Sequence, residues 1–161
     1  MKFKEAADVL VREAAAGHAL LDQMVIPIMY LYRQYTELTL KEMIMFGREV
    51  VGKCCGYPMN EHDLKELWQE ALSLLTEHYG ADVPSEAGNV NSCIEDIHAH
   101  DPKSFAFRYP TDKNGKPYLT GIRHINIRNL HENMDRLASF LDCISTDLGT
   151  AYDFVMEQKK G

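Results

Sequence analysis

The stretch that decides the fold runs from Pro27 to Leu75 and reads PIMYLYRQYTELTLKEMIMFGREVVGKCCGYPMNEHDLKELWQEALSLL. Apolar residues of its first half recur at three-, four- and seven-residue steps, on one stripe of a helix: Ile28, Leu31, Tyr35, Leu38 and Met45. A second set with the helical period follows a segment rich in turn and N-cap types, and it comprises Leu64, Leu67, Trp68, Ala71, Leu74 and Leu75. Glycines and a proline between the two sets leave only a short connection, which predicts two neighbouring antiparallel helices.

Amphipathic helices are also expected near both ends of the chain. The first covers residues 3–20, and Gly17 and Pro27 allow a bend or break after it, unless residues 19–26 stay helical and Pro27 opens the next segment. Apolar residues step by four and three from roughly Ile127 to Gln158, which predicts the longest helix, capped by Asn126 or Asn129. Because this seam exceeds what the central helices can cover, part of it is expected to pair with a second copy of the protein.

The remaining residues predict a loop, a short helix and a small insert. Residues 80–91 are rich in glycine, proline and asparagine and predict a loop, and a weak helical period follows up to Asp101. In residues 103–121, alternating aromatic residues and an Asn-Gly pair indicate a two-stranded ribbon, and an ordered loop pinned by three rings is an equally favoured alternative. The expected fold is therefore all-α: an up-and-down bundle of four or five helices with a ribbon or loop insert near residues 103–121, in a single domain over residues 1–161.

Composition limits the classes of function. A chain of 161 residues can bury a core without disulfides or a metal, and its formal charge of -7 gives no general attraction to phosphate backbones. Any contact with nucleic acid would therefore need a local basic site. Four cysteines without C-x-x-C spacing, and a start without a secretory signal, predict a reduced cytoplasmic protein. Charged residues interrupt the best apolar stretch, so no membrane span is expected.

The central stretch carries a pattern found in a known superfamily. It reads Y-R-x-x-x-E-L-x-L-K, then a short glycine-bearing link, then H-D-L-x-x-L-W, and the residues are Tyr32, Arg33, Glu37, Leu38, Leu40, Lys41, His62, Asp63, Leu64, Leu67 and Trp68. This pattern resembles the HEPN superfamily of small helical bundles. The resemblance implies a helical domain that forms homodimers, often beside a nucleotidyltransferase. In active members it also implies a metal-independent ribonuclease site, built across the dimer from an arginine and a histidine that are separated by four to six residues.

The chain departs from that ribonuclease pattern. Arg128 and Asn129 open the last helix, where the superfamily places its motif, but only two residues separate Arg128 from His131. Histidine can move a proton near neutral pH and arginine can stabilise a developing phosphate charge, so Arg128 and His131 are the candidate catalytic pair. Arg123 and His124 lie just upstream and would extend it to a degenerate site. The alternative interpretation is an exposed basic first turn of the helix.

Other side chains are candidate contacts for a ligand or RNA. Arg33, Glu37 and Lys41 follow at four-residue steps on the face opposite the apolar stripe. They either line a polar groove together with His62 and Asp63 or form ion pairs within the helix. Arg108 stands between two aromatic residues and could contact a phosphate or stack on a base, or else tether the insert.

The sequence predicts no cofactor and no metal site. It contains no phosphate-binding glycine loop, zinc signature or hydrolase elbow, and His98 and His100 diverge on a helix without enough partner ligands. The expected function is a HEPN-like dimerisation or interaction module that binds a partner protein, such as a nucleotidyltransferase, or a nucleotide or RNA, in a prokaryotic defence or toxin-antitoxin setting. The alternative is a metal-independent endoribonuclease with a degenerate Arg/His site at a homodimer interface.

Overall fold

The computed structural model describes the chain except for residues 1, 18–20, 55, 110, 119–124 and 161, and it omits the side chains of residues 21 and 22. The described residues form five α-helices and one 3-10 turn: α1 (Lys2–Ala15), α2 (Leu21–Val50), α3 (Leu64–Tyr79), η1 (Gly80–Asp82), α4 (Ala87–His100) and α5 (Ile127–Gln158). They contain no strand, so the all-α prediction is confirmed.

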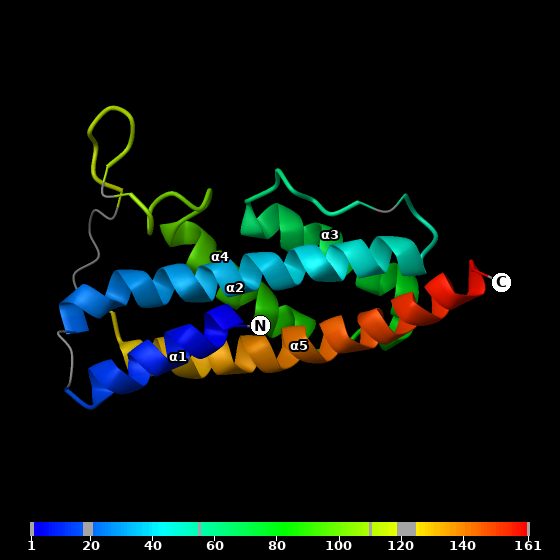
Figure 1. The fold of residues 1–161 in the computed structure, drawn as a ribbon, viewed down its shortest axis with the longest axis horizontal. Helices are drawn as coiled ribbons and strands as arrows, with labels where there is room; N and C mark the ends of the chain where they lie inside the picture. Colours follow the sequence, from blue (N-terminus) through cyan, green and yellow to red (C-terminus); the bar gives the residue numbers. More distant parts are fainter. Residues whose placement is uncertain (1, 18–20, 55, 110, 119–124, 161) are drawn as a thin grey trace.

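Helix α2 is the central element, because α1, α3 and α5 all pack against it (Figure 1). Its sequence explains this position: apolar residues such as Ile28 and Tyr35 are buried on one side, and polar residues such as Arg33 are buried on another. The break allowed at Pro27 does not occur. One helical hydrogen bond is lost there, but Met24 and Val25, one turn earlier, pack against the core and hold the first turns of α2 in place.

Helix α3 runs parallel to α2, so the predicted antiparallel hairpin is wrong. Arg48 of α2 binds Glu70 of α3, at 2.7 Å from Nε to Oε1, and Lys53, just beyond α2, binds Glu77 near the end of α3. Residue numbers therefore increase together along both helices. The described residues of the link, 51–54 and 56–63, return along the outside of α2 before α3 begins (Figure 1).

Cationic side chains of α2 hold this returning link. They lie about two helical turns apart, and each donates to a backbone carbonyl of the link: Arg48 to Gly56 (2.8 Å), Lys41 to Met59 (3.3 Å) and Arg33 to His62 (2.6 Å). A segment without helix or strand leaves its carbonyls without regular partners, and these side chains supply them. The glycines suggested a short turn between the two helices. The connection is instead an extended segment, which the side chains of Arg33, Lys41 and Arg48 hold along α2.

The predicted apolar patterns of α3 and α5 are confirmed. All six apolar residues named for α3 are buried, Asp63 caps its first turn, and most of the α5 seam is buried between Met134 and Leu148. The Asn126 side chain caps α5 by accepting from the Asn129 N–H at 3.1 Å. Helix α4 begins at Ala87, within the stretch expected to be a loop, and it lies antiparallel to α5, as the residues of the cavities between them show.

The described part of residues 103–121 is a loop and not a ribbon. It holds one isolated antiparallel bridge, between Thr111 and Pro117, around a turn at Gly115. Residues 119–121 of this range lie outside the described residues. In the described part of the chain, no helix is both long enough and apolar enough to span a bilayer.

Candidate functional site

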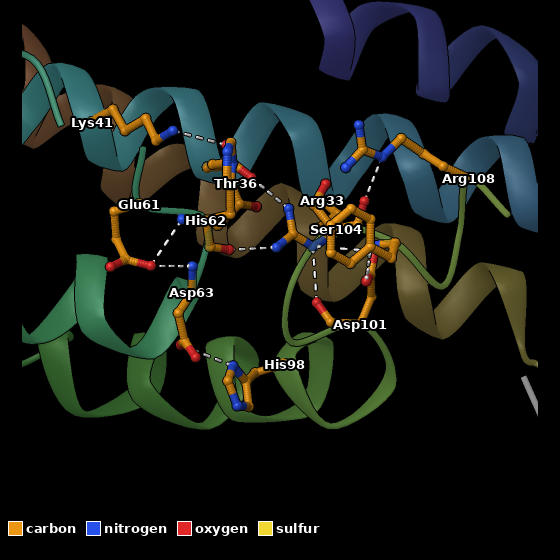
Figure 2. Close-up of polar contacts among 12 residues, drawn as sticks. Arg33, Thr36, Lys41, Glu61, His62, Asp63, His98, Asp101, Ser104 and Arg108 are labelled. Atoms are coloured by element: carbon orange, nitrogen blue, oxygen red, sulfur yellow. Dashed lines mark hydrogen bonds and ion pairs between the residues drawn. The ribbon is translucent and has the colours of Figure 1, made fainter. Parts of the chain in front are cut away.

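Four buried charged side chains form a cluster between α2 and the loop after α4; we call Arg33, Glu37, Lys41 and Asp101 the Arg33 cluster. Figure 2 labels its members Arg33, Lys41 and Asp101. Arg33 Nη1 lies 2.6 Å from Glu37 Oε2, and Arg33 Nε lies 3.0 Å from the Asp101 carbonyl oxygen and 3.3 Å from its Oδ2. Lys41 Nζ lies 3.0 Å from Glu37 Oε1. Two cations therefore face two carboxylates, and the charges balance inside the protein.

The ion pairs expected within α2 are present, but they are buried rather than lining an open groove. Burial by itself would raise the pKa of the Glu37 carboxyl, yet hydrogen bonds from Arg33, His62 and Lys41 outweigh it and hold this pKa below its ordinary value. Of the three residues that bind Glu37, His62 is the exposed one. Its side chain is 49% exposed, and its Nδ1 lies 2.8 Å from Glu37 Oε1. This arrangement suits an anchor better than a substrate pocket.

Asp101 connects the Arg33 cluster to the loop after α4. Its Oδ1 accepts hydrogen bonds from the backbone N–H groups of Phe105 (2.7 Å) and Ala106 (2.9 Å), four and five residues further along the chain. Ser104, which lies between Asp101 and Phe105 in the sequence, has a positive φ of 62°, which turns the chain. The anchored carboxylate thereby sets the direction of residues 104–109, a role that the sequence analysis did not predict for Asp101.

Arg108 belongs to a single helical turn. The Tyr109 N–H donates to the Phe105 carbonyl at 2.9 Å, so residues 105, 108 and 109 lie on one side of the turn. The Arg108 guanidinium lies 5.3 Å from the Phe105 ring centroid and 5.7 Å from that of Tyr109, and its Nε donates to the Ser104 carbonyl. Phe105 and Tyr109 are 44% and 52% exposed. We call Phe105, Arg108 and Tyr109 the aromatic platform.

The loop that carries the platform is also basic. Residues 102–118 contain four basic side chains, at Lys103, Arg108, Lys113 and Lys116, against one acidic side chain at Asp112, in a chain whose net charge is -7. Tyr118, at the end of this range, is 37% exposed. A local count of charges along the sequence would have found this segment, because the acidic average conceals it.

The two candidate catalytic residues have different surroundings. Arg128 is exposed on the first turn of α5. The polar partners of His131 in the described residues are Tyr32 Oη, 2.9 Å from Nδ1, Asp8 Oδ1, 3.4 Å from Nδ1, and Asp135 Oδ2, 3.5 Å from Nε2. Arg128 is not among them. Arg123 and His124, the upstream part of the degenerate site, lie outside the described residues.

Asn129 and the histidines of α4 occupy other positions. Asn129 lines a cavity of about 240 Å³ between α4 and the start of α5. His98 Nδ1 lies 3.1 Å from Asp63 Oδ1, so this histidine joins α4 to the cap of α3 (Figure 2), and His100 lines the same cavity as Asn129. Asn129 and His100 thus lie at the cavity between α4 and α5, and His98 lies at the start of α3.

A wider groove of about 810 Å³ continues along α4 and α5. Its floor includes Leu137, Phe140 and Ile144 of α5, and its rims carry Glu86 on the α4 side and Arg136 on the α5 side. The groove therefore combines apolar side chains with one acidic and one basic rim residue.

Comparison with known proteins gives no relative. No protein-family model matches the chain, and no curated protein or solved structure gives a significant match. Function must therefore be argued from the residues themselves.

Proposed function

We propose that the chain is a HEPN-like helical interaction module that binds single-stranded RNA through the aromatic platform and the basic loop around it. The observation that carries this proposal is the exposed pair of rings at Phe105 and Tyr109, whose centroids lie 6.3 Å apart, with the Arg108 guanidinium beside both of them. Aromatic rings stack on unpaired bases, and nearby cations attract the phosphates. The resemblance in the central stretch favours RNA as the nucleic acid.

The Arg33 cluster supports this proposal because it holds the platform in place. A binding loop loses less conformational freedom on binding when its backbone is already fixed. Here Asp101 fixes the turn through two N–H groups, and Arg33 fixes Asp101 from the buried side. The candidate residues Arg33, Glu37 and Lys41 therefore act as supports of the contact surface, while Arg108 touches the RNA.

Fluorescence anisotropy with a labelled single-stranded oligoribonucleotide tests the proposal. We expect saturable binding by the wild type. Phe105→Ala and Tyr109→Ala should each weaken it by about 5-fold to 150-fold, since one base–ring stack is worth about 1–3 kcal/mol. With four cations in the loop, the slope of log K against log salt should not exceed about 3 in magnitude. A DNA oligonucleotide of the same sequence measures the preference for RNA.

Phe154→Ala is the matched control, because Phe154 is 62% exposed on α5 and lies outside the loop. It removes an exposed ring of the same kind and should leave RNA affinity unchanged. Equal affinities of the wild type and a Phe105→Ala/Tyr109→Ala double variant would refute the role of the platform.

The endoribonuclease alternative is tested in the same samples. The polar contacts of His131 are with Tyr32, Asp8 and Asp135 and do not include Arg128, so no contact among the described residues joins the candidate catalytic pair. Gel analysis of the RNA after incubation should therefore find it intact with the wild type. If RNA is cleaved, and an Arg128→Ala/His131→Ala double variant has lost that cleavage, the alternative replaces the binding module.

We also propose that a second copy of the chain docks on the α4–α5 groove. Two observations support this: the groove has an apolar floor, and its acidic and basic rims let Glu86 of one copy face Arg136 of the other in a two-fold arrangement. Light scattering should then report about twice the chain mass of 18.4 kDa.

Ser139→Arg places a large cation at the exposed edge of this groove and should yield a monomer. Ser73→Arg makes the same substitution at an exposed position of α3 and should leave the dimer intact. A wild type that is monomeric at micromolar concentration would contradict the dimer without touching the RNA proposal.

A further inference from the structure

A second polar cluster joins the first helix, α1, to the beginning of the last helix, α5. Asp8 from α1 meets His131 and Asp135 from α5, and ligand-type atoms of these three residues all lie within 4.8 Å of one another. Lys4 of α1 and Tyr32 of α2 complete the group. More than 120 positions of sequence separate Asp8 from His131, so no local motif could have revealed the cluster.

The cluster already holds a cation. Lys4 Nζ lies 2.7 Å from Asp8 Oδ2 and 2.6 Å from Asp135 Oδ1, so one ammonium bridges the two carboxylates. The Tyr32 hydroxyl donates a further hydrogen bond to the Asp8 carboxylate, at 2.8 Å from Oδ1. The position of Lys4 Nζ marks where positive charge is stabilised.

The Tyr32 hydroxyl determines which imidazole nitrogen is free in the neutral ring. Its single hydrogen is donated to Asp8 Oδ1 at 2.8 Å, so toward His131 Nδ1, at 2.9 Å, it can only accept. Nδ1 then carries the ring proton, and the lone pair of Nε2 points to the side of Asp135 Oδ2, 3.5 Å away. A lone pair beside a carboxylate is unfavourable unless a proton or a metal ion lies between them.

We propose that Asp8, His131 and Asp135 bind a divalent transition-metal ion, which takes the place of the Lys4 ammonium. One imidazole nitrogen and two carboxylates suit zinc or nickel better than magnesium, which prefers oxygen ligands alone. His131 and Asp135 lie one helical turn apart on α5, so both can reach one ion. Tyr32 acts as the outer partner that orients His131 and Asp8. Asp135 is half exposed, which leaves the ion a path from solvent.

This site departs from the sequence-based expectation of no metal, and it involves none of the residues of the RNA proposal. The ion would connect α1 to α5. With Nε2 bound to the ion, His131 would not transfer a proton. Binding can therefore be measured without any assay of RNA.

Isothermal titration with zinc chloride, nickel chloride and magnesium chloride, in the presence of a phosphine reductant, tests the site. We expect one zinc or nickel ion per chain and much weaker binding of magnesium. His131→Ala and Asp135→Asn should each weaken the binding of zinc and nickel by about tenfold or more, as loss of one ligand does. Asp135→Asn changes an exposed side chain, so it keeps the test valid if His131→Ala unfolds the protein.

Two further variants separate this site from adventitious binding. Lys4→Met removes the competing ammonium and should tighten zinc binding several-fold, an effect that no site elsewhere on the protein would produce. His78→Ala removes an exposed histidine of α3 and should change nothing. Unchanged zinc affinity in both His131→Ala and Asp135→Asn, or no tightening in Lys4→Met, would overturn the proposal.

Discussion

Replacing Arg33 by methionine tests the idea that the Arg33 cluster anchors the fold. The Arg33 side chain is fully buried and donates to Glu37, to the Asp101 carbonyl and to the His62 carbonyl. Methionine keeps much of the aliphatic stem but leaves Asp101 buried without its cation. Removing one partner of a buried ion pair costs about 3–5 kcal/mol, because the remaining charge stays desolvated. Glu37 should contribute little to this cost, since Lys41 still binds its carboxylate. The cost should therefore come mainly from Asp101.

Urea unfolding followed by far-UV circular dichroism measures this cost. At about 2–4 °C per kcal/mol for a chain of this size, Arg33→Met should also lower the melting temperature by roughly 6–20 °C. Arg12→Met is the matched control, because Arg12 is exposed on α1, and it should change stability by less than about 0.5 kcal/mol. In an Arg33→Met/Glu37→Met double variant, the loss should fall short of the sum of the single losses by about 0.5–3 kcal/mol. If Arg33→Met unfolds like Arg12→Met, the anchor does not exist.

Three further outcomes follow from the described contacts. The pKa of Glu37 is lower in the folded protein than in the unfolded chain, so stability should fall as the pH drops below about 4.5. The urea midpoints of the wild type and Glu37→Gln should converge as the pH falls through this range. A difference between the two midpoints that does not change with pH would contradict this. Gly47→Val should cost about 1–3 kcal/mol because a Cβ on Gly47 would lie 3.2 Å from Leu74 Cβ, whereas Gly88→Ala, in open space on α4, should gain up to about 1 kcal/mol in the same urea assay. Asp63→Ala should cost about 1 kcal/mol by removing the α3 cap, and a neutral result would show that the cap is dispensable.

The sequence predicted α3 and α5 well because each has one apolar side and one polar side. In such a helix the spacing of leucines reports directly which residues are buried. For α2 the same reasoning captured only part of the core. Arg33, Glu37 and Lys41 are buried because they neutralise each other, and a hydrophobicity pattern counts every charged residue as exposed.

Contacts between distant segments account for the other differences. Glycines in the link suggested a short turn, but its path depends on carbonyl contacts with Lys41 and Arg48, which no local pattern encodes. Alternating rings around Arg108 suggested a strand. These residues instead form a helical turn, whose first N–H groups, of Phe105 and Ala106, donate to the Asp101 carboxylate. For His131 the neighbour in sequence was considered as a partner, whereas its closest polar partner lies on α2.

The path of residues 51–63 also bears on how the chain folds. A helical hairpin forms from contacts close in sequence, but a parallel pair requires the connection to close a longer loop before α3 can dock. Since folding rates fall as the average separation of contacting residues grows, this chain should fold more slowly than an up-and-down bundle of equal length. The slow step is then the docking of α3 on α2, after the link has settled along the cationic side chains.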